Sequence, residues 1–187
     1  MLRARVVLAT LFASTLSSVV ARADDVRSDT ARFGGYFQGG VEIGFAPGQT
    51  SVLPGLFLRG GPTYGVLHGG AEVSLAIGPS NGRGFAVNAG ALGTLGVHAP
   101  ALGTITPFAD VHFGPMFFHR EGPGTTDAGG LWGGVSVGVA AYDRVGSSAG
   151  GFIGATALTP LSRPSMNSGD VASVVVPLFL RAGVAIR

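Results

Sequence analysis

The stretch 131–143, LWGGVSVGVAAYD, decides how this chain is expected to fold. A β-strand sends successive side chains to opposite faces, so the two alternate sets of residues form two surfaces. One set is apolar throughout and consists of Leu131, Gly133, Val135, Val137, Val139 and Ala141. The other is mostly small or polar and consists of Trp132, Gly134, Ser136, Gly138, Ala140 and Tyr142. This pattern predicts a strand of a transmembrane β-barrel, with hydrocarbon on one side and a crowded, partly polar interior on the other.

The same alternation recurs along the chain and predicts eight strands. They are expected at 33–45, 52–59, 64–77, 85–97, 104–118, 131–143, 150–158 and 171–186. The second is the weakest because Pro54 and Gly55 interrupt it, Gly60-Gly61-Pro62 is expected to form the turn that follows, and the seventh is ambiguous in register. An even strand count brings both chain ends to the periplasmic side, so the long connections at 120–130 and 160–170 are expected outside the cell.

The first 23 residues have the three parts of a secretory signal peptide. Arg3 and Arg5 precede a short apolar run at 6–20, and the small-x-small site Ala21-Arg22-Ala23 follows. The apolar run is too short for a membrane-spanning helix and is broken by Ser and Thr. The expected organisation is therefore a signal peptide at 1–23, a short N-terminal extension at 24–31 and one barrel domain at 32–187.

The composition excludes several classes of function. The chain has 12 basic residues, all of them Arg, 10 acidic residues and no Cys. Without residues 1–23, nine Arg face ten acidic residues, which leaves no basic excess for nucleic acid. The lack of Lys rules out a P-loop site and Schiff-base chemistry, and the lack of Cys rules out disulfides and thiolate metal sites. Charged residues make up only 12% of the chain, about half of the share usual for a soluble domain.

The eight-strand alternation over residues 31–187 resembles that of the small outer-membrane barrels of the OmpA/OmpX kind. The resemblance implies an all-β, antiparallel, up-and-down barrel in a bacterial outer membrane. It also implies contact with outer-membrane lipid and with the barrel assembly machinery. One departure concerns the last strand, because such barrels often end on an aromatic residue, whereas this chain ends Val184-Ala185-Ile186-Arg187.

Seven ionisable residues fall on the inward set of these strands. A charge inside a narrow barrel is costly unless it is paired, so they are expected to form a structural network that fills the bore. They are Glu42, Arg59, His68, Glu72, Asp110, His112 and Arg181. Arg181 cannot lose its charge and must find partners. The alternation offers Glu42, Glu72 and Asp110, and sequence alone leaves the choice open.

No catalytic, cofactor or metal site is expected. Some eight-stranded outer-membrane barrels are lipid enzymes, but a hydrolase needs Ser, His and a carboxylate within hydrogen-bond reach. His112 has Asp110 two residues away on the same face, but no Ser in that strand completes the set. Ser74 and Ser136 are candidates only if they project near the rim of the barrel. There is no HExxH motif or closely spaced His pair for a metal, and no GxGxxG motif that opens a helix for a dinucleotide.

The expected function is therefore structural, or surface interaction with an unknown partner through the external loops. The loop residues expected to form that surface are Arg120, Glu121, Thr125, Thr126, Asp127, Arg163, Asn167 and Asp170. The main alternative is a small passive channel, since many inward Gly residues leave space in the bore. A soluble lipocalin-like carrier would require the faces to be reversed, and a lipid A-modifying enzyme would require the missing catalytic set.

Overall fold

The computed structural model of this chain describes residues 33–45, 52–79, 84–99, 102, 104–121, 126–142, 148–161, 165–166 and 178–187. The expected signal peptide and N-terminal extension lie outside these residues. Within them, no helix is long and apolar enough to cross a membrane.

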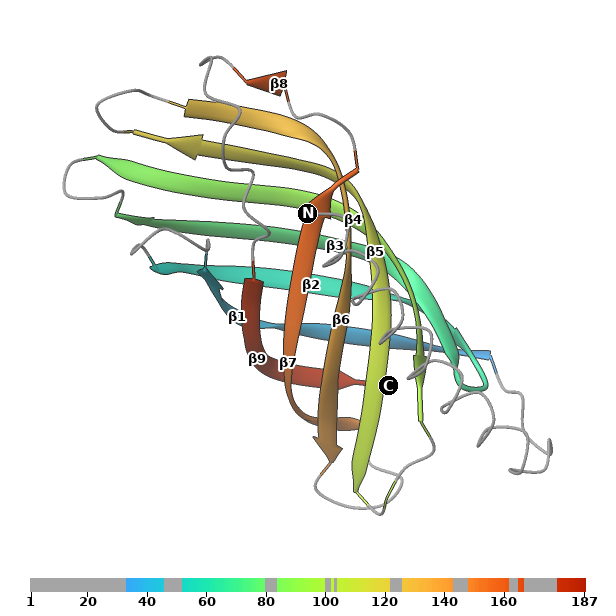
Figure 1. The fold of residues 1–187 in the computed structure, drawn as a ribbon. Helices are drawn as coiled ribbons and strands as arrows, with labels where there is room; N and C mark the ends of the chain where they lie inside the picture. Colours follow the sequence, from blue (N-terminus) through green and yellow to red (C-terminus); the bar gives the residue numbers. More distant parts are fainter. Residues whose placement is uncertain are drawn as a thin grey trace, which may run out of the picture.

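The described chain is a closed antiparallel barrel (Figure 1). Its elements are β1 (Phe33–Phe45), β2 (Val52–Tyr64), β3 (Leu67–Pro79), β4 (Phe85–His98), β5 (Ile105–Arg120), β6 (Thr126–Tyr142), β7 (Ala149–Pro160), β8 (Ser165–Met166) and β9 (Leu178–Ile186). Each of the first six strands pairs with the next one along the chain, β7 pairs with β9, and β9 closes against β1. Eight strands thus form the wall, and the two-residue β8 pairs with the beginning of β6 outside it.

The strands are staggered by a fixed amount around the wall. Stepping from Phe33 to its partner on the next strand, and so on around the barrel, returns to β1 at Ile43, ten residues further along. The circuit passes through Tyr64, Leu67, Val97, Ala109, Val137, Ala155 and Leu180. Such a stagger requires the strands to tilt by about 35–45° from the barrel axis. It also decides which inward residues of distant strands meet at one level.

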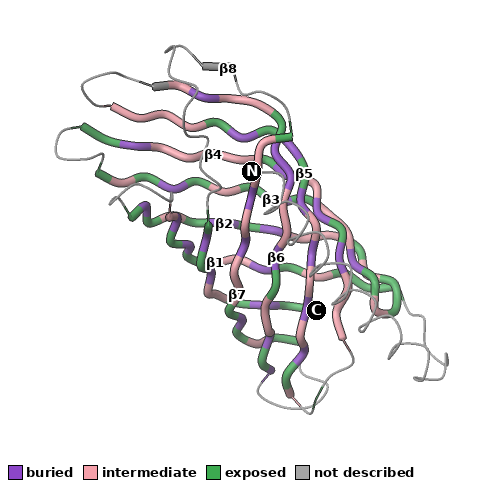
Figure 2. The backbone as a smooth tube through the Cα atoms, in the orientation of Figure 1, coloured by how far each residue is buried: buried purple, intermediate pink, exposed green. Residues whose placement is uncertain are grey.

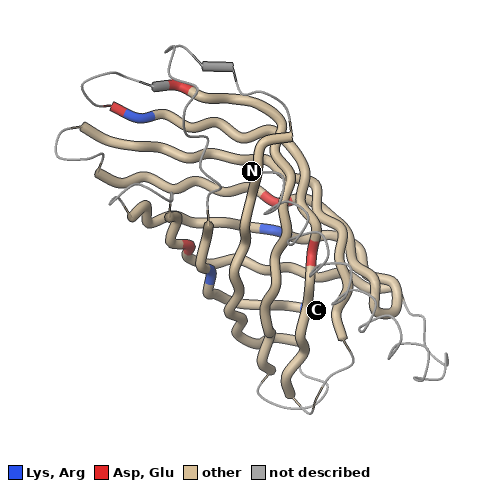
Figure 3. The backbone as a smooth tube through the Cα atoms, viewed as in Figure 1, with Lys and Arg blue, Asp and Glu red and all other residues tan. Residues whose placement is uncertain are grey.

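Burial alternates along each strand as the sequence predicts (Figure 2). Large apolar side chains are exposed on the outer surface of all eight wall strands, among them Val41, Leu56, Val73, Leu95, Phe113, Val137, Ile153 and Leu180. Of the charged residues described, five are buried inside and the others lie near the strand ends, so none interrupts the middle of this outer surface (Figure 3). A continuous apolar exterior on a wall without free edges is the surface of a membrane-spanning barrel.

The turn expected at Gly60-Gly61-Pro62 is wrong. These residues continue β2 opposite β1, and the chain turns instead at Gly65 and Val66, with Gly65 in the left-handed region (φ 58°). The ladder from β2 to β3 skips Gly61 and Pro62, which fits the lack of an N–H donor on proline. The Gly-Gly-Pro run therefore marks an interruption on one side of a strand and not its end.

The polar connection expected at 120–130 is shorter than predicted. β6 begins at Thr126, so the backbones of Thr126 and Asp127 belong to a strand and pair with Arg120 and His119 of β5. In the connection expected at 160–170, Ser165 and Met166 form β8. The first part of the expected last strand, 171–177, lies outside the described residues, as do Thr125, Arg163, Asn167 and Asp170.

Glycines permit a close approach of the two backbones at the seam between β1 and β9. A Cβ atom on Gly40 would overlap the carbonyl of Ala182, and one on Gly183 would overlap the carbonyl of Gly39. The first and last strands can therefore pair here only because both positions lack side chains.

Candidate functional site

The polar interior of the barrel contains all seven ionisable residues that the alternation sends inward. Their exposed fractions range from 1% for Glu42, Glu72 and Asp110 to 6% for His68. They come from β1, β2, β3, β5 and β9, so they tie opposite sides of the wall together. Charges this deeply buried must be paired and hydrogen-bonded, so the stability of the interior depends on their partners.

Arg181 joins the closing seam to the far side of the bore. Its Nε donates to Glu42 Oε2 at 3.1 Å, and Glu42 is its direct partner in the β1–β9 register. Its Nη1 and Nη2 donate to the two oxygens of Glu72 on β3, at 2.9 and 2.7 Å, in the bidentate geometry that favours arginine. The guanidinium also lies 4.6 Å from the ring centre of Phe57. Two of the three expected partners thus hold Arg181, and Asp110 does not.

Asp110 belongs to a second group centred on Arg59. Arg59 Nη1 donates to Asp110 Oδ2 at 2.5 Å, and its Nε donates to Gln38 Oε1 at 2.6 Å. The other oxygen of Asp110 is hydrogen-bonded to His68 Nε2. Four strands therefore meet at this group, because Gln38, Arg59, His68 and Asp110 lie on β1, β2, β3 and β5.

A third chain of contacts runs from His112 across to β7. Ser136 Oγ lies 2.5 Å from His112 Nε2 and 2.7 Å from Thr156 Oγ1, while His112 Nδ1 lies 3.5 Å from Glu72 Oε2. Serine, histidine and carboxylate therefore follow one another as in a hydrolase. Glu72 is already bound bidentately by Arg181, and all three side chains are buried, so no substrate reaches this set in the described structure.

Apolar clusters close the bore on both sides of the polar layer. The buried residues of β6 show how the layers are arranged. Along this strand Trp132, Ser136 and Ala140 follow one another on the inward face, so the polar residue lies between two apolar ones. The cluster nearer the β5–β6 turn consists of Leu92, Met116, Trp132, Leu158 and Phe179. The cluster nearer the chain termini consists of Phe57, Phe108, Ala140, Tyr142, Phe152 and Ala185.

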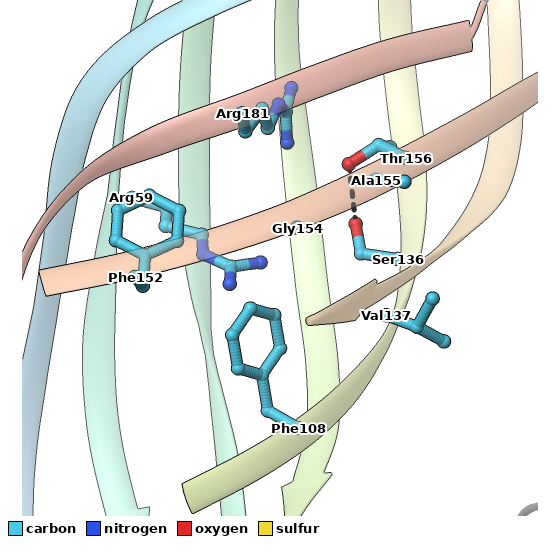
Figure 4. A pocket seen from close by; sticks show the side chains of 9 residues that line it. All are labelled: Arg59, Phe108, Ser136, Val137, Phe152, Gly154, Ala155, Thr156 and Arg181. Atoms are coloured by element: carbon cyan, nitrogen blue, oxygen red, sulfur yellow. Dashed lines mark hydrogen bonds between the residues drawn. The ribbon is translucent and has the colours of Figure 1, made fainter. Parts of the chain in front are cut away.

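The space left beside the polar layer is small. A cavity of about 10 Å³ lies between the guanidinium groups of Arg59 and Arg181 and the hydroxyls of Ser136 and Thr156 (Figure 4). That is about the space needed for one water molecule. Side chains therefore fill this part of the interior.

The end of the barrel at which β5 and β6 join, termed the hairpin end, carries the described part of the expected external surface. His119 Nδ1 lies 2.6 Å from Asp127 Oδ1, and the Phe85 N–H donates to Glu121 Oε2 at 3.2 Å. Arg120 is the last residue of β5. Across the part of the chain that the structure describes, no group of three or more His, Asp or Glu is arranged to hold a metal ion.

Sequence reasoning did not include five polar residues that take part in the interior contacts. Tyr36 and Gln38 share an alternate set with Glu42, so strict alternation identifies both, and Tyr36 Oη lies 3.1 Å from Thr94 Oγ1. Thr156 was missed because the register of its strand was ambiguous. His98 follows directly after the expected strand 85–97 and is the last residue of β4.

These features define a closed, eight-stranded, membrane-spanning β-barrel with a filled polar interior. No protein-family model matches the chain, and no curated protein matches it in sequence. Among solved structures, it is similar to neisserial surface protein A, NspA, with a TM-score of 0.61 and 12% identity over 83% of this chain and 98% of that one. At this identity the likeness shows a shared fold.

Proposed function

We propose that this chain is a bacterial outer-membrane β-barrel that acts as a structural or surface-interaction protein through the connections at its hairpin end. The observation that carries the proposal is the apolar exterior, which is present on all eight wall strands. Outer-membrane lipid would be the partner of that surface. The similar fold of NspA, which is described as a surface protein, supports the same location.

The two ends of the barrel differ in a way that supports this orientation. At the end where β1 begins and β9 ends, termed the terminal end, β2 and β3 are joined by only two residues. β5 and β6, which join at the hairpin end, are the longest strands. At the same end, 17 residues separate β7 from β9. Bacterial barrels have short periplasmic turns and longer external loops. The hairpin end is therefore the one assigned to the outside of the cell.

The filled interior favours a structural role over a passive channel. Ion pairs cross the bore from β9 to β3 and from β2 to β5, and apolar side chains pack on both sides of them. An eight-stranded barrel has an interior just wide enough for such side chains. The faces are also opposite to those of a soluble carrier, which needs an apolar interior and a polar exterior.

Epitope insertion at the two ends tests this proposal. A short tag beside Thr125, in the β5–β6 connection, is expected to be tolerated and stained on intact cells. The matched tag beside Arg144, in the β6–β7 connection at the terminal end, is expected to be stained only after permeabilisation. Staining of Arg144 alone on intact cells would reverse the orientation. The absence of both tags from the outer membrane would overturn the proposal.

A further inference from the structure

A hollow of about 660 Å³ lies on the outer surface of the barrel over β6, β7 and β9. Its floor is Ala155 of β7, which pairs with Val137 of β6 on one side and with Leu180 of β9 on the other. The side chains of Val137 and Leu180 are exposed and form the two banks, while Ile153 stands at one end. The small cavity in Figure 4 lies on the inner side of the same wall and also touches Val137 and Ala155. Unlike that cavity, the outer hollow has a volume typical of ligand sites.

Other recesses on the outer surface are filled by the chain's own side chains. A Cβ atom on Gly93 would lie 2.9 Å from the ring of Phe113, and one on Gly39 would lie 2.7 Å from Leu58. Among the described residues, no side chain covers Ala155 in the same way. An empty hollow would forfeit dispersion contacts along its whole lining. Something outside the described chain is therefore expected to fill it.

The lining of the hollow suits an apolar occupant. Its side chains are aliphatic apart from Arg181, whose guanidinium is bound inside the bore by Glu42 and Glu72. The backbones of the three strands are paired in the β6–β7 and β7–β9 ladders at this level. The described lining therefore offers no free hydrogen-bond donor or acceptor, and a sugar, peptide or lipid headgroup would lose its hydrogen bonds there.

The hollow lies at the level of the membrane interior. Ala155 is in the middle of β7, next to Thr156, which belongs to the polar layer between the two apolar clusters of the bore. The hydrocarbon core of a bilayer is about 30 Å thick, so the middle of a wall strand lies far from the headgroups. The banks are also continuous with the apolar exterior of the other wall strands. Lipid hydrocarbon is therefore the material that meets this part of the wall.

The shape of the hollow favours a single chain over a second copy of the barrel. Val137 and Leu180 lie on the strands directly on either side of β7, so the floor between them is one strand wide. Neighbouring strands are about 4.8 Å apart, which places the banks about 10 Å apart. A second barrel has a convex wall, which would rest on the banks and leave the floor uncovered. An extended hydrocarbon chain is narrow enough to lie between them.

We propose that this hollow is a binding site for one acyl chain of an outer-membrane lipid, which lies over Ala155 between Val137 and Leu180. The inference rests on the proposed function, because only a barrel in a membrane meets lipid at this face. The bound chain contacts the floor and both banks, whereas a lipid elsewhere on the convex wall contacts the protein on one side. The additional dispersion contacts hold the chain at this site in preference to the rest of the exterior.

Photolabelling in lipid vesicles tests the site. The full barrel is folded into phosphatidylcholine vesicles doped with a phosphatidylcholine that carries a diazirine on one acyl chain, and the labelled residues are mapped by mass spectrometry. We expect more label on Ala155 and Leu180 than on Val73, an exposed outward residue of β3. Even labelling of the exterior would overturn the acyl-chain site but not the membrane barrel. Label on Val73 with none in the hollow would mean that a protein covers it, which also overturns the site. A barrel without label on its outer face, Val73 included, would contradict the proposed function itself.

A pair of variants separates the hollow from a general effect of a larger side chain on the lipid side. Ala155→Leu fills the floor, so the excess label on Leu180 should be lost. The matched control is Ala71→Leu, which adds the same side chain at an exposed outward position of β3 and should leave the label in the hollow unchanged. The gel mobility of each variant before and after boiling shows that it has folded. If the excess label persists in Ala155→Leu, or disappears equally in both variants, the hollow does not hold the chain.

Discussion

Removal of the guanidinium of Arg181 perturbs the interior most directly. In Arg181→Met, the side chain keeps much of its length and apolar volume but loses its contacts with two carboxylates. Glu42 and Glu72, each 1% exposed, would then lack their main cation. Breaking a buried ion pair by removing one partner costs about 3–5 kcal/mol. We therefore expect Arg181→Met to lower the free energy of unfolding by about 3 kcal/mol.

Urea unfolding in detergent micelles measures this loss, because the fluorescence of the single tryptophan, Trp132, reports on the buried interior. Adding Glu72→Gln to Arg181→Met should restore part of the stability, since it removes one of the orphaned charges. Adding Asp110→Asn instead should restore none, because Arg59 and His68 hold Asp110. The reasoning is refuted if Arg181→Met unfolds like the wild type, or if the two second substitutions rescue it equally.

Three further predictions concern the faces, the seam and the bore. Val137→Arg places a charge on the lipid side at mid-strand and should lower the free energy of unfolding by about 2–4 kcal/mol, whereas Ser136→Ala on the inner face should lower it by about 1 kcal/mol. Urea midpoints that fall equally in the two variants would contradict the assigned faces. Gly183→Ala should lower the free energy of unfolding by about 1–3 kcal/mol, because the new Cβ has no room at the seam. In Gly151→Ala the nearest neighbouring atom is 3.6 Å from the new Cβ, so this variant should unfold like the wild type. Planar bilayers with the purified barrel should show no single-channel conductance, and steady ion-conducting steps would contradict the filled interior.

The period of two was sufficient to predict the wall. The outward face of each strand meets hydrocarbon and the inward face meets the packed interior, so the inward and outward sets differ along its whole length. Confirmed examples are the first strand, found at Phe33–Phe45 as expected, and the outward placement of Val137 and Leu180. Alternation was weaker where side chains are absent, which is why the Gly-rich β7 was ambiguous and Thr156 was missed.

The contacts between inward residues could not be predicted in the same way. Whether Arg181 meets Glu72 or Asp110 depends on the ten-residue stagger around the barrel, and no short-range pattern in the sequence encodes it. The direct neighbour Glu42 required the register of the first strand against the last. The contact between His68 and His98, whose Nδ1 atoms are 3.4 Å apart, likewise depended on the end of β4, which alternation placed one residue too early.

Turn signals were the least reliable part of the sequence. Gly-Gly-Pro at 60–62 was interpreted as a turn because glycine and proline usually interrupt a ladder on both sides. In this barrel Pro62 still faces Gly35 on β1 and interrupts only the pairing with β3. Tertiary pairing with β1 therefore overrode the local signal.

The central claim is that this chain spans the outer membrane as a closed barrel. Its most direct test is to separate inner and outer membranes of expressing cells and to run the outer-membrane fraction on a gel with and without boiling. The protein should appear in the outer-membrane fraction, and the unheated band should migrate differently from the boiled one because the barrel remains folded in detergent. A protein recovered in the soluble periplasm, or one with the same mobility before and after boiling, would contradict the claim.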